Sequence, residues 1–276
     1  MARPLKDSSE PTMTGKTLRI RRIAREGLYL SIPMDHGVSV GPIAGIENPT
    51  ATIREVDQGG ASMIVLHKGL VKNYASAEPK AGLMVHVSSS TDKAQDGNDK
   101  RLVATVDEVL RTGADGVSVH VNMGSLTEPD QLEDFAHIVT EASRFDLPVL
   151  CMMYPRGPTI KDPFKPEVVA HAARLAEELG ADIVKTLYTG DAKTFRDVTS
   201  SVSIPVLVAG GPKADTDSAV LELVHGAMRA GAAGASIGRN VWQAKRPRAM
   251  TEALARIIYN GVDAKAAQKA LKEVKT

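Results

Sequence analysis

The stretch Gly180-Ala181-Asp182-Ile183-Val184-Lys185-Thr186 (residues 180–186) decides the fold. It follows residues 166–179, whose apolar positions recur with the helical period of about 3.6. A glycine in the left-handed conformation closes a helix, and the short apolar run directly after it is typical of a buried parallel strand. The same junction of helix, Gly-Ala pair and strand recurs at Gly113 and Gly231. These junctions predict the tight turns found at the bottom of an α/β barrel.

Short apolar runs alternate with longer amphipathic stretches along the rest of the chain. The eight predicted strands are residues 28–34, 62–67, 83–87, 116–121, 148–153, 181–186, 204–209 and 234–237. The predicted helices are residues 14–26, 50–58, 99–111, 130–143, 166–179, 217–230 and 263–275, the last with Asp263 as its N-cap.

This alternation fits either a closed barrel or an open doubly wound sheet. Eight repeats match the size of a (β/α)8 barrel, and no Gly-x-Gly-x-x-Gly follows the first strand, as a dinucleotide-binding sheet requires. We therefore predict an α/β fold with a single TIM barrel over residues 14–276. The barrel carries an N-terminal helix and a C-terminal outer helix, and residues 1–13 form a flexible arm.

Composition excludes several classes of function. The net charge of +1 and the aromatic content of 4% give no basic field and few stacking platforms, so we expect no nucleic-acid partner. No apolar run approaches the length of a membrane span, and the N-terminus lacks an apolar signal core. The single cysteine, Cys151, lies in an apolar run and is more typical of a core residue than of a nucleophile. We expect a cytoplasmic protein with no membrane partner.

Three residues at predicted strand ends suggest covalent chemistry. Lys185 stands near the end of an apolar strand, where burial lowers the pKa of an ammonium and the neutral amine can form a Schiff base. The alternative is an ordinary lysine that reaches solvent. Asp35 and Tyr154 end the first and fifth strands, so all three side chains meet at one mouth. Tyr154 suits a proton donor and Asp35 an acceptor, although His36 competes for either role. Asp35 can instead cap a turn, and Tyr154 can simply fill the mouth.

Glycine pairs after the seventh and eighth strands predict a phosphate site. Gly210-Gly211 and Gly238-Arg239 offer backbone amides and a guanidinium where barrels commonly bind phosphate. Arg156, Lys68 and Lys213 are candidates for a second anion, with surface ion pairing as the alternative.

Three histidines near neighbouring strand ends raise the question of a metal. His67, His86 and His120 follow or end the second, third and fourth strands and suit zinc as ligands. They form no compact motif, so we favour hydrogen-bonded histidines and expect neither a metal nor any other cofactor.

Several segments together resemble the archaeal-type class I aldolase family. They are residues 32–42 (IPMDHGVSVGP), 154–157 (YPRG), 181–186 (ADIVKT), 188–191 (YTGD), 208–213 (VAGGPK) and 238–243 (GRNVWQ). The similarity runs from about residue 17 to 260. The form of the first segment is closer to the heptulosonate synthase branch than to the fructose-bisphosphate branch.

The resemblance implies an enzyme that needs no cofactor. It implies Lys185 as the Schiff-base lysine, Tyr154 as proton donor and Asp35 as proton acceptor. The implied substrate contacts are His36, Gly37, Val38, Ser39, Pro155 and Arg156, with phosphate at Gly210, Gly211, Gly238 and Arg239.

The implied reaction is a class I aldolase or transaldolase reaction. An enamine from a small phosphorylated sugar donor is joined to an aldehyde acceptor, L-aspartate semialdehyde, in aromatic amino acid biosynthesis. Two alternatives stay open: dihydroxyacetone phosphate as donor to the same acceptor, or cleavage of fructose 1,6-bisphosphate. Members of this family assemble as large rings, often decamers, so a homo-oligomer is expected.

Overall fold

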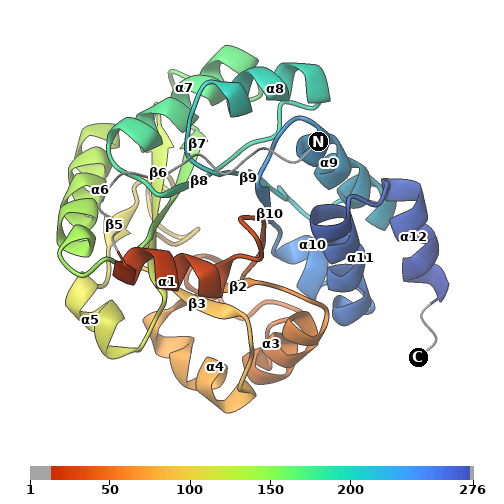
Figure 1. Ribbon diagram of the computed structural model, residues 1–276. Coiled ribbons are helices and arrows are strands. Elements are labelled where there is room, and N and C mark those ends of the chain that lie inside the picture. Colours follow the sequence, from red (N-terminus) through yellow and green to blue (C-terminus); the bar gives the residue numbers. More distant parts are fainter. Residues whose placement is uncertain (1–13, 274–276) are drawn as a thin grey trace.

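The computed structural model describes residues 14–273. Within that range, eight parallel strands form a closed barrel in the order β1-β10-β9-β8-β7-β6-β3-β2 (Figure 1). Their bounds are β1 Tyr29–Pro33, β2 Met63–His67, β3 Gly82–His86, β6 Gly116–Met123, β7 Val149–Pro155, β8 Ile183–Thr186, β9 Val206–Ala209 and β10 Gly234–Ser236. The predicted TIM barrel is confirmed, while the predicted arm at residues 1–13 lies outside the described residues.

Helices surround the barrel on the outside (Figure 1). They are α1 Thr14–Ile23, α2 Gly37–Val40, α3 Pro49–Gln58, α4 Val71–Ala77, α5 Val106–Arg111, α6 Glu128–Ser143, α7 Pro166–Glu178, α8 Ala192–Ser200, α9 Asp217–Arg229, α10 Arg239–Trp242, α11 Pro247–Asn260 and α12 Ala264–Glu273, with a 3-10 turn at Lys68–Leu70. The sequence reading missed α2, α4, α8, α10 and α11. The longest helix, α6, has 16 residues, and no helix among residues 14–273 has the length and hydropathy of a membrane span.

One predicted helix was wrong over its first half. Residues 99–111 were expected to be helical, but α5 begins only at Val106. Thr105 caps it through a reciprocal pair of hydrogen bonds with Glu108. The preceding residues form β5 (Arg101–Leu102), which pairs with β4 (Ser88–Ser89) in a small antiparallel sheet. The helix begins later than expected because the capping residue is Thr105, and the residues before it are free to pair as a strand.

The three helix-to-strand junctions have the expected backbone. Gly113, Gly180 and Gly231 have φ values of 76°, 95° and 95°, in the left-handed region. At the C-terminus, Asp263 Oδ1 accepts a hydrogen bond from Ala266 N at 2.8 Å, which confirms the predicted cap of α12. This helix packs outside α9 and α11 (Figure 1).

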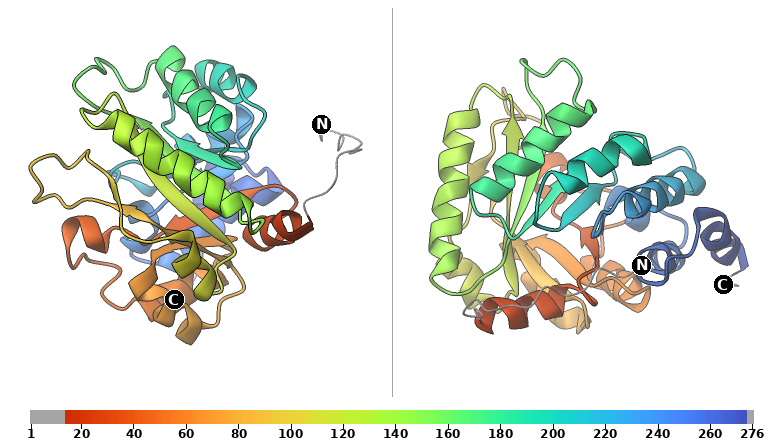
Figure 2. Two further views of the ribbon diagram at one scale, coloured as in Figure 1. Left: turned by 90° about the vertical axis from the view of Figure 1, so that its left-hand side faces the viewer. Right: turned by 45° about the horizontal axis from the view of Figure 1, so that its top comes forward.

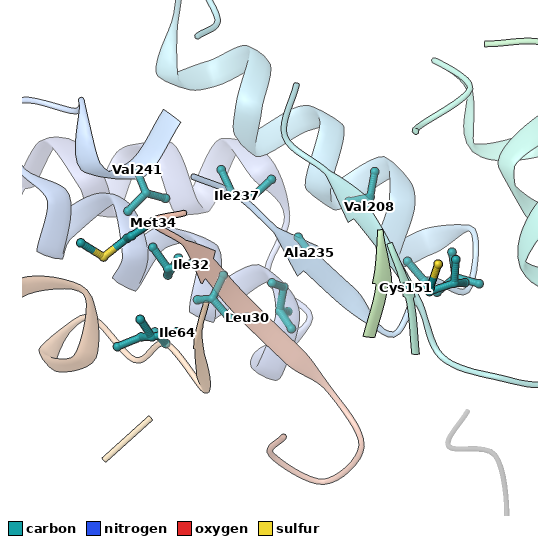
Figure 3. Close-up of a cluster of buried hydrophobic side chains, with 14 of the residues drawn as sticks. Leu30, Ile32, Met34, Ile64, Cys151, Val208, Ala235, Ile237 and Val241 are labelled. Atoms are coloured by element: carbon teal, nitrogen blue, oxygen red, sulfur yellow. The ribbon is translucent and has the colours of Figure 1, made fainter. Parts of the chain in front are cut away.

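Alternate strand residues face opposite sides of the barrel wall. The inner cluster includes Tyr29, Met63, Val65, Met84, Leu150, Met152, Tyr154, Ile183 and Leu207. The outer cluster lies between the strands and the helices and includes Leu30 and Ile32 of β1 and Met34 directly after it, with Ile64 beside them (Figure 3). Cys151 belongs to the outer cluster, and burial raises the pKa of its thiol, so it is a core residue as expected.

Helix α1 covers the amino-terminal end of the barrel (Figure 1). Lys16 Nζ lies 2.9 Å from Asp182 Oδ1, and Arg22 Nη1 lies 3.2 Å from Asp115 Oδ1. Ile23, fully buried, joins the inner cluster. The long loops after β3 and β7 extend from the opposite end (Figure 2). Closure of one end leaves the carboxyl-terminal strand ends as the entrance to the barrel.

Candidate active site

A cavity of about 290 Å³ opens among the carboxyl-terminal strand ends. Its lining comes from every strand of the barrel, so residues far apart in sequence meet there. The lining residues are Pro33, Asp35, His36, Ser39, His67, His86, Ser88, Ser89, Lys100, His120, Met152, Tyr154, Arg156, Lys185, Leu187, Ala209, Gly210, Gly211, Ser236, Gly238 and Arg239.

Lys185 projects into this cavity from β8. In the strand register it lies level with Met152 of β7 and Leu207 of β9, both members of the inner cluster. Its exposed fraction is 7%, which rules out a strand-end lysine that reaches freely into solvent. Its Nζ atom lies 6.0 Å from the centre of the Tyr154 ring, which projects from β7 two residues beyond Met152. The amine and the phenol therefore share one cavity.

Asp35 lies just after β1 and is held among nitrogen-bearing side chains. Its Oδ1 lies 3.3 Å from His36 Nδ1, and its Oδ2 lies 3.9 Å from His86 Nε2. Burial raises the pKa of Asp35, but the interaction with His36 and the field of the neighbouring groups, Lys185 among them, outweigh it and hold the pKa well below its usual range. Asp35 is therefore a carboxylate at neutral pH and can accept a proton.

The three histidines weighed as zinc ligands all line the cavity, but as separate hydrogen-bonded groups. His86 Nδ1 lies 2.8 Å from Ser118 Oγ, and His120 Nε2 lies 2.8 Å from Asn122 Oδ1. Burial lowers the pKa of His86 to about 3 and also lowers those of His67 and His120. Within residues 14–273, no group of three His, Cys, Asp or Glu side chains is arranged to hold a metal ion. These histidines give the cavity an uncharged polar wall.

The predicted phosphate residues lie together on the side of β9 and β10. Asn240 Nδ2 donates to the carbonyls of Gly210 and Pro212 at 2.9 Å each, which ties the two loops together. A side chain at position 238 would meet Pro33 O at 2.9 Å, so only glycine lets the loop after β10 approach the end of β1 this closely. Arg239 Nη2 donates to Gly211 O at 3.1 Å. The loops present a fixed backbone surface to the cavity.

The other predicted residues divide into two groups. His36, Ser39 and Arg156 line the cavity, whereas Gly37, Val38 and Pro155 do not. Gly37 and Val38 are exposed in α2, and Pro155 is buried as the last residue of β7.

Both lysines that were candidates for a second anion lie outside the cavity. Lys68 pairs with Glu108 at 2.6 Å and Lys213 is exposed, and neither lines the cavity.

The sequence reading missed Lys100, Ser88, Ser89 and Ser236 on the cavity wall. Lys100 was hidden because it fell inside the range expected to be helical. The pair Ser88-Ser89, directly after an apolar strand, was the one signal in the sequence that a polar strand end lay there.

Comparison with known proteins agrees with this geometry. Residues 29–244 match the model of the DeoC/LacD family aldolases. The chain belongs to the DeoC/LacD aldolase family. This aldolase is 42% identical over 256 residues to a 2-amino-3,7-dideoxy-D-threo-hept-6-ulosonate synthase of Halobacterium salinarum, covering 93% of this chain and 96% of the relative.

Two further relatives define the class of this aldolase. It is 42% identical over 252 residues to a 2-amino-4,5-dihydroxy-6-oxo-7-(phosphonooxy)heptanoate synthase of Streptomyces griseus, covering 89% and 90% of the two chains. An archaeal fructose-1,6-bisphosphate aldolase, solved with its catalytic lysine bound to a carbinolamine intermediate, is 33% identical with a TM-score of 0.82 and covers 89% of this chain and 100% of its own. The family and this solved structure make the protein a class I aldolase.

Proposed function

We propose that this aldolase adds an enamine, formed on Lys185 from a phosphorylated ketose, to L-aspartate semialdehyde. The observation that carries the proposal is the buried Lys185 amine, which shares one cavity with Tyr154 and the ionised Asp35. A lysine nucleophile, a proton donor and a proton acceptor are the groups that Schiff-base aldol chemistry needs.

The names of the relatives support the acceptor. Each names a synthase whose product is a seven-carbon acid with an amino group at C2 and a ketone at C6. Aldol chemistry joins the carbon next to a ketone to an aldehyde carbon, so the new bond is C4–C5. The acceptor half is then a four-carbon amino acid aldehyde, which is aspartate semialdehyde, and the donor half is a three-carbon ketone.

The proposed first half-reaction forms the enamine. The Lys185 amine attacks the donor carbonyl and forms a carbinolamine. Tyr154 then gives a proton to the hydroxyl of the carbinolamine, which departs as water, and an iminium forms. Asp35 then takes the proton of the donor hydroxyl, and the adjacent carbon–carbon bond breaks. Its electron pair enters the iminium and gives the enamine, while an aldehyde leaves.

The second half-reaction makes the product. The enamine carbon attacks the aldehyde carbon of the acceptor, and the proton held by Asp35 passes to the new alkoxide. Water then hydrolyses the iminium and frees Lys185. The glycine loops at 210–211 and 238–239, with Arg239, line the same cavity and suit a phosphate that stays on the enamine half, as it does when dihydroxyacetone phosphate is the donor.

Two different molecules are candidates for the donor. The Streptomyces griseus relative is as similar as the one from Halobacterium salinarum, and its product keeps a phosphate on C7. A C7 phosphate requires dihydroxyacetone phosphate as donor, which forms the enamine by loss of a proton rather than by cleavage. The 7-deoxy product instead requires a deoxy-diketohexose phosphate, whose phosphate leaves with the expelled aldehyde. Fructose 1,6-bisphosphate tests the remaining alternative.

Borohydride trapping tests the proposal directly. Each of these three donors is incubated in turn with the enzyme and borohydride, and the donor that the enzyme uses should add the mass of its reduced fragment to Lys185, located by peptide mass spectrometry. Addition of L-aspartate semialdehyde before borohydride should discharge the adduct and release a seven-carbon amino acid. Lys185→Arg should form no adduct with any donor. Equal adduct formation in Lys185→Arg would contradict the proposal.

Assembly and location remain part of the proposal. We expect a homo-oligomer, with a decamer as the ring that the family resemblance suggests, and a cytoplasmic enzyme. Mass photometry of the purified chain measures the number of subunits.

A further inference from the structure

Lys100 and Arg156 are two cationic side chains on the cavity wall. Lys100 Nζ donates to Ser90 Oγ at 2.5 Å, and the Arg156 guanidinium lies 5.4 Å from the centre of the Tyr154 ring. Within residues 14–273, neither forms a salt bridge, whereas the neighbouring Arg101 pairs with two carboxylates at 2.7 and 2.9 Å. Two cationic side chains that line one cavity without an ion pair point to an anion as their ligand.

The electrostatics of this wall favour such an anion. Burial lowers the pKa of Lys100, and the charge of Arg156 lowers it further, so the two cations repel each other. The histidines on the same side of the cavity have lowered pKa values and add no positive charge at neutral pH. An anion bound between Lys100 and Arg156 would relieve their repulsion and would be held by charge-assisted hydrogen bonds.

The position of these cations separates them from the donor phosphate site. Around the barrel, β3 lies opposite β9, and β6 lies opposite β10. Lys100 lies in the segment between β3 and β6 and lines the same cavity as the glycine loops, which follow the strands on the opposite side of the barrel. Lys185 is on β8, which lies between β9 on the glycine side and β7, and Arg156 directly follows β7. A substrate with an anion at each end can therefore span the cavity past the amine.

We propose that Lys100 and Arg156 bind the anionic group of the acceptor aldehyde, which is its carboxylate when the acceptor is an amino acid aldehyde. The assignment rests on the proposed function with dihydroxyacetone phosphate as donor, because it takes the glycine loops as the site of a phosphate that stays on the enamine. On this proposal Lys100 determines acceptor specificity through its charge and takes no part in the covalent step at Lys185.

Acceptor kinetics of Lys100→Gln test this assignment. With a fixed donor, KM for L-aspartate semialdehyde should rise about 10-fold to 100-fold, the loss expected for one hydrogen bond to a charged group. D-Glyceraldehyde 3-phosphate, a phosphate-bearing acceptor, reports whether the subsite takes phosphate as well. Uncharged D-glyceraldehyde should react at the rate of the unchanged enzyme. The proposal would be overturned if KM rose equally for all three acceptors. It would also be overturned if KM stayed unchanged for both anionic acceptors.

Two variants control for the fold and for the loop. Lys100→Arg keeps the charge and should restore most of the affinity for anionic acceptors. Lys93→Gln removes a lysine of the same loop whose side chain is 86% exposed and pairs with Asp92, and it should leave all acceptor kinetics unchanged.

A binding measurement separates this proposal from the proposed function. L-Homoserine carries the carboxylate and amino group of the acceptor but a hydroxyl in place of the aldehyde, so it can bind without reacting with an enamine. Calorimetry should show weaker binding to Lys100→Gln than to the unchanged enzyme, by the same fold as KM. Borohydride trapping of the donor on Lys185 should be equal in both proteins. Normal trapping with unchanged homoserine affinity would reject the subsite alone, and absent trapping with weakened homoserine binding would reject the donor chemistry alone.

Discussion

Individual side chains in the cavity owe their properties to what surrounds them. Asp35 keeps its charge in a buried place because His36 and Lys185 lie near it. His86, only a few ångströms away, loses its charge because burial outweighs the attraction of Asp35. The cavity therefore holds one permanent carboxylate beside neutral imidazoles, and a proton that leaves the substrate has one clear acceptor.

Removal of the phenol should slow proton transfer and leave the covalent step possible. We expect Tyr154→Phe to lower kcat by about 100-fold to 10,000-fold, the usual contribution of a positioned acid or base. Lys185 should still be modified by donor and borohydride, because its amine is unchanged. Steady-state rates and the mass of the trapped peptide check both parts. A rate near that of the unchanged enzyme would remove Tyr154 from the mechanism.

His86 should make the stability of the fold depend on pH. Its pKa is about 3 in the folded protein and about 6.5 in an unfolded chain. The unfolded state binds more protons between these values, so stability is complete above about pH 6.5 and falls as the pH drops toward 3. From pH 7 to pH 5, His86 alone should account for a loss of about 2 kcal/mol in the free energy of unfolding.

Urea unfolding at several pH values measures this effect. His86→Gln should lose less stability than the unchanged protein over the same interval. His171→Gln, which alters an exposed histidine on α7, should behave like the unchanged protein. Parallel pH curves for all three proteins would contradict the assignment of a neutral buried His86.

Strands and loops reach the positions that the site needs through close backbone contacts. Gly157, after β7, packs against the loop after β6, where an added Cβ would lie 1.8 Å from Gly124 O. Gly234 begins β10, and an added Cβ would lie 1.9 Å from Tyr29 O of β1, its partner in the register. These glycines allow neighbouring elements to close together, so a larger residue has no room to adjust.

Substitution at the closure of the barrel should be strongly destabilising. Gly234→Ala should lower the free energy of unfolding by about 3 kcal/mol, because the new methyl group meets backbone that cannot rotate away. Gly69→Ala is the matched control, since nothing lies within 4 Å of its added Cβ. Thermal unfolding of both variants compares the two costs. A Gly234→Ala protein as stable as Gly69→Ala would show that β1 and β10 are not in this contact.

The molecule as a whole separates stability from chemistry between its two ends. At the closed end, Asp182 accepts hydrogen bonds from Lys16 Nζ at 2.9 and 3.0 Å and from Val149 N at 2.9 Å. At the open end, three residues further along the chain, Lys185 faces the cavity. Residues of the same short segment thus serve the two ends of the barrel, as is general for this fold.

Changes at the closed end should therefore affect stability more than turnover. Asp182→Ala should cost about 1–3 kcal/mol in the free energy of unfolding, because it leaves the Val149 amide without its acceptor. Lys16→Ala, which removes only the ion pair, should cost no more than about 1 kcal/mol. Both should keep kcat near that of the unchanged enzyme at 25 °C. A large fall in kcat with intact stability would show that α1 is coupled to the active site.

The local pattern of residues was enough to predict much of the fold and the position of Lys185. Helix ends at Gly113, Gly180 and Gly231, together with the alternating apolar runs, predicted eight parallel strands, and the barrel confirms them. Lys185 was predicted at the mouth because a lysine in an apolar strand is unusual. Such features depend on neighbours in the chain, so hydrophobic period and backbone conformation are enough to predict them.

Other features depended on contacts between distant segments. The pairing of β4 with β5, which replaced the start of a predicted helix, brings Lys100 to the cavity. Contacts elsewhere pair Lys68 with Glu108, and Gly37 and Val38 lie outside the lining. Charge states followed too, since His86 and Asp35 take theirs from burial and from each other. Tertiary structure decided these points because burial, pairing and electrostatic fields arise only when remote parts of the chain are brought together.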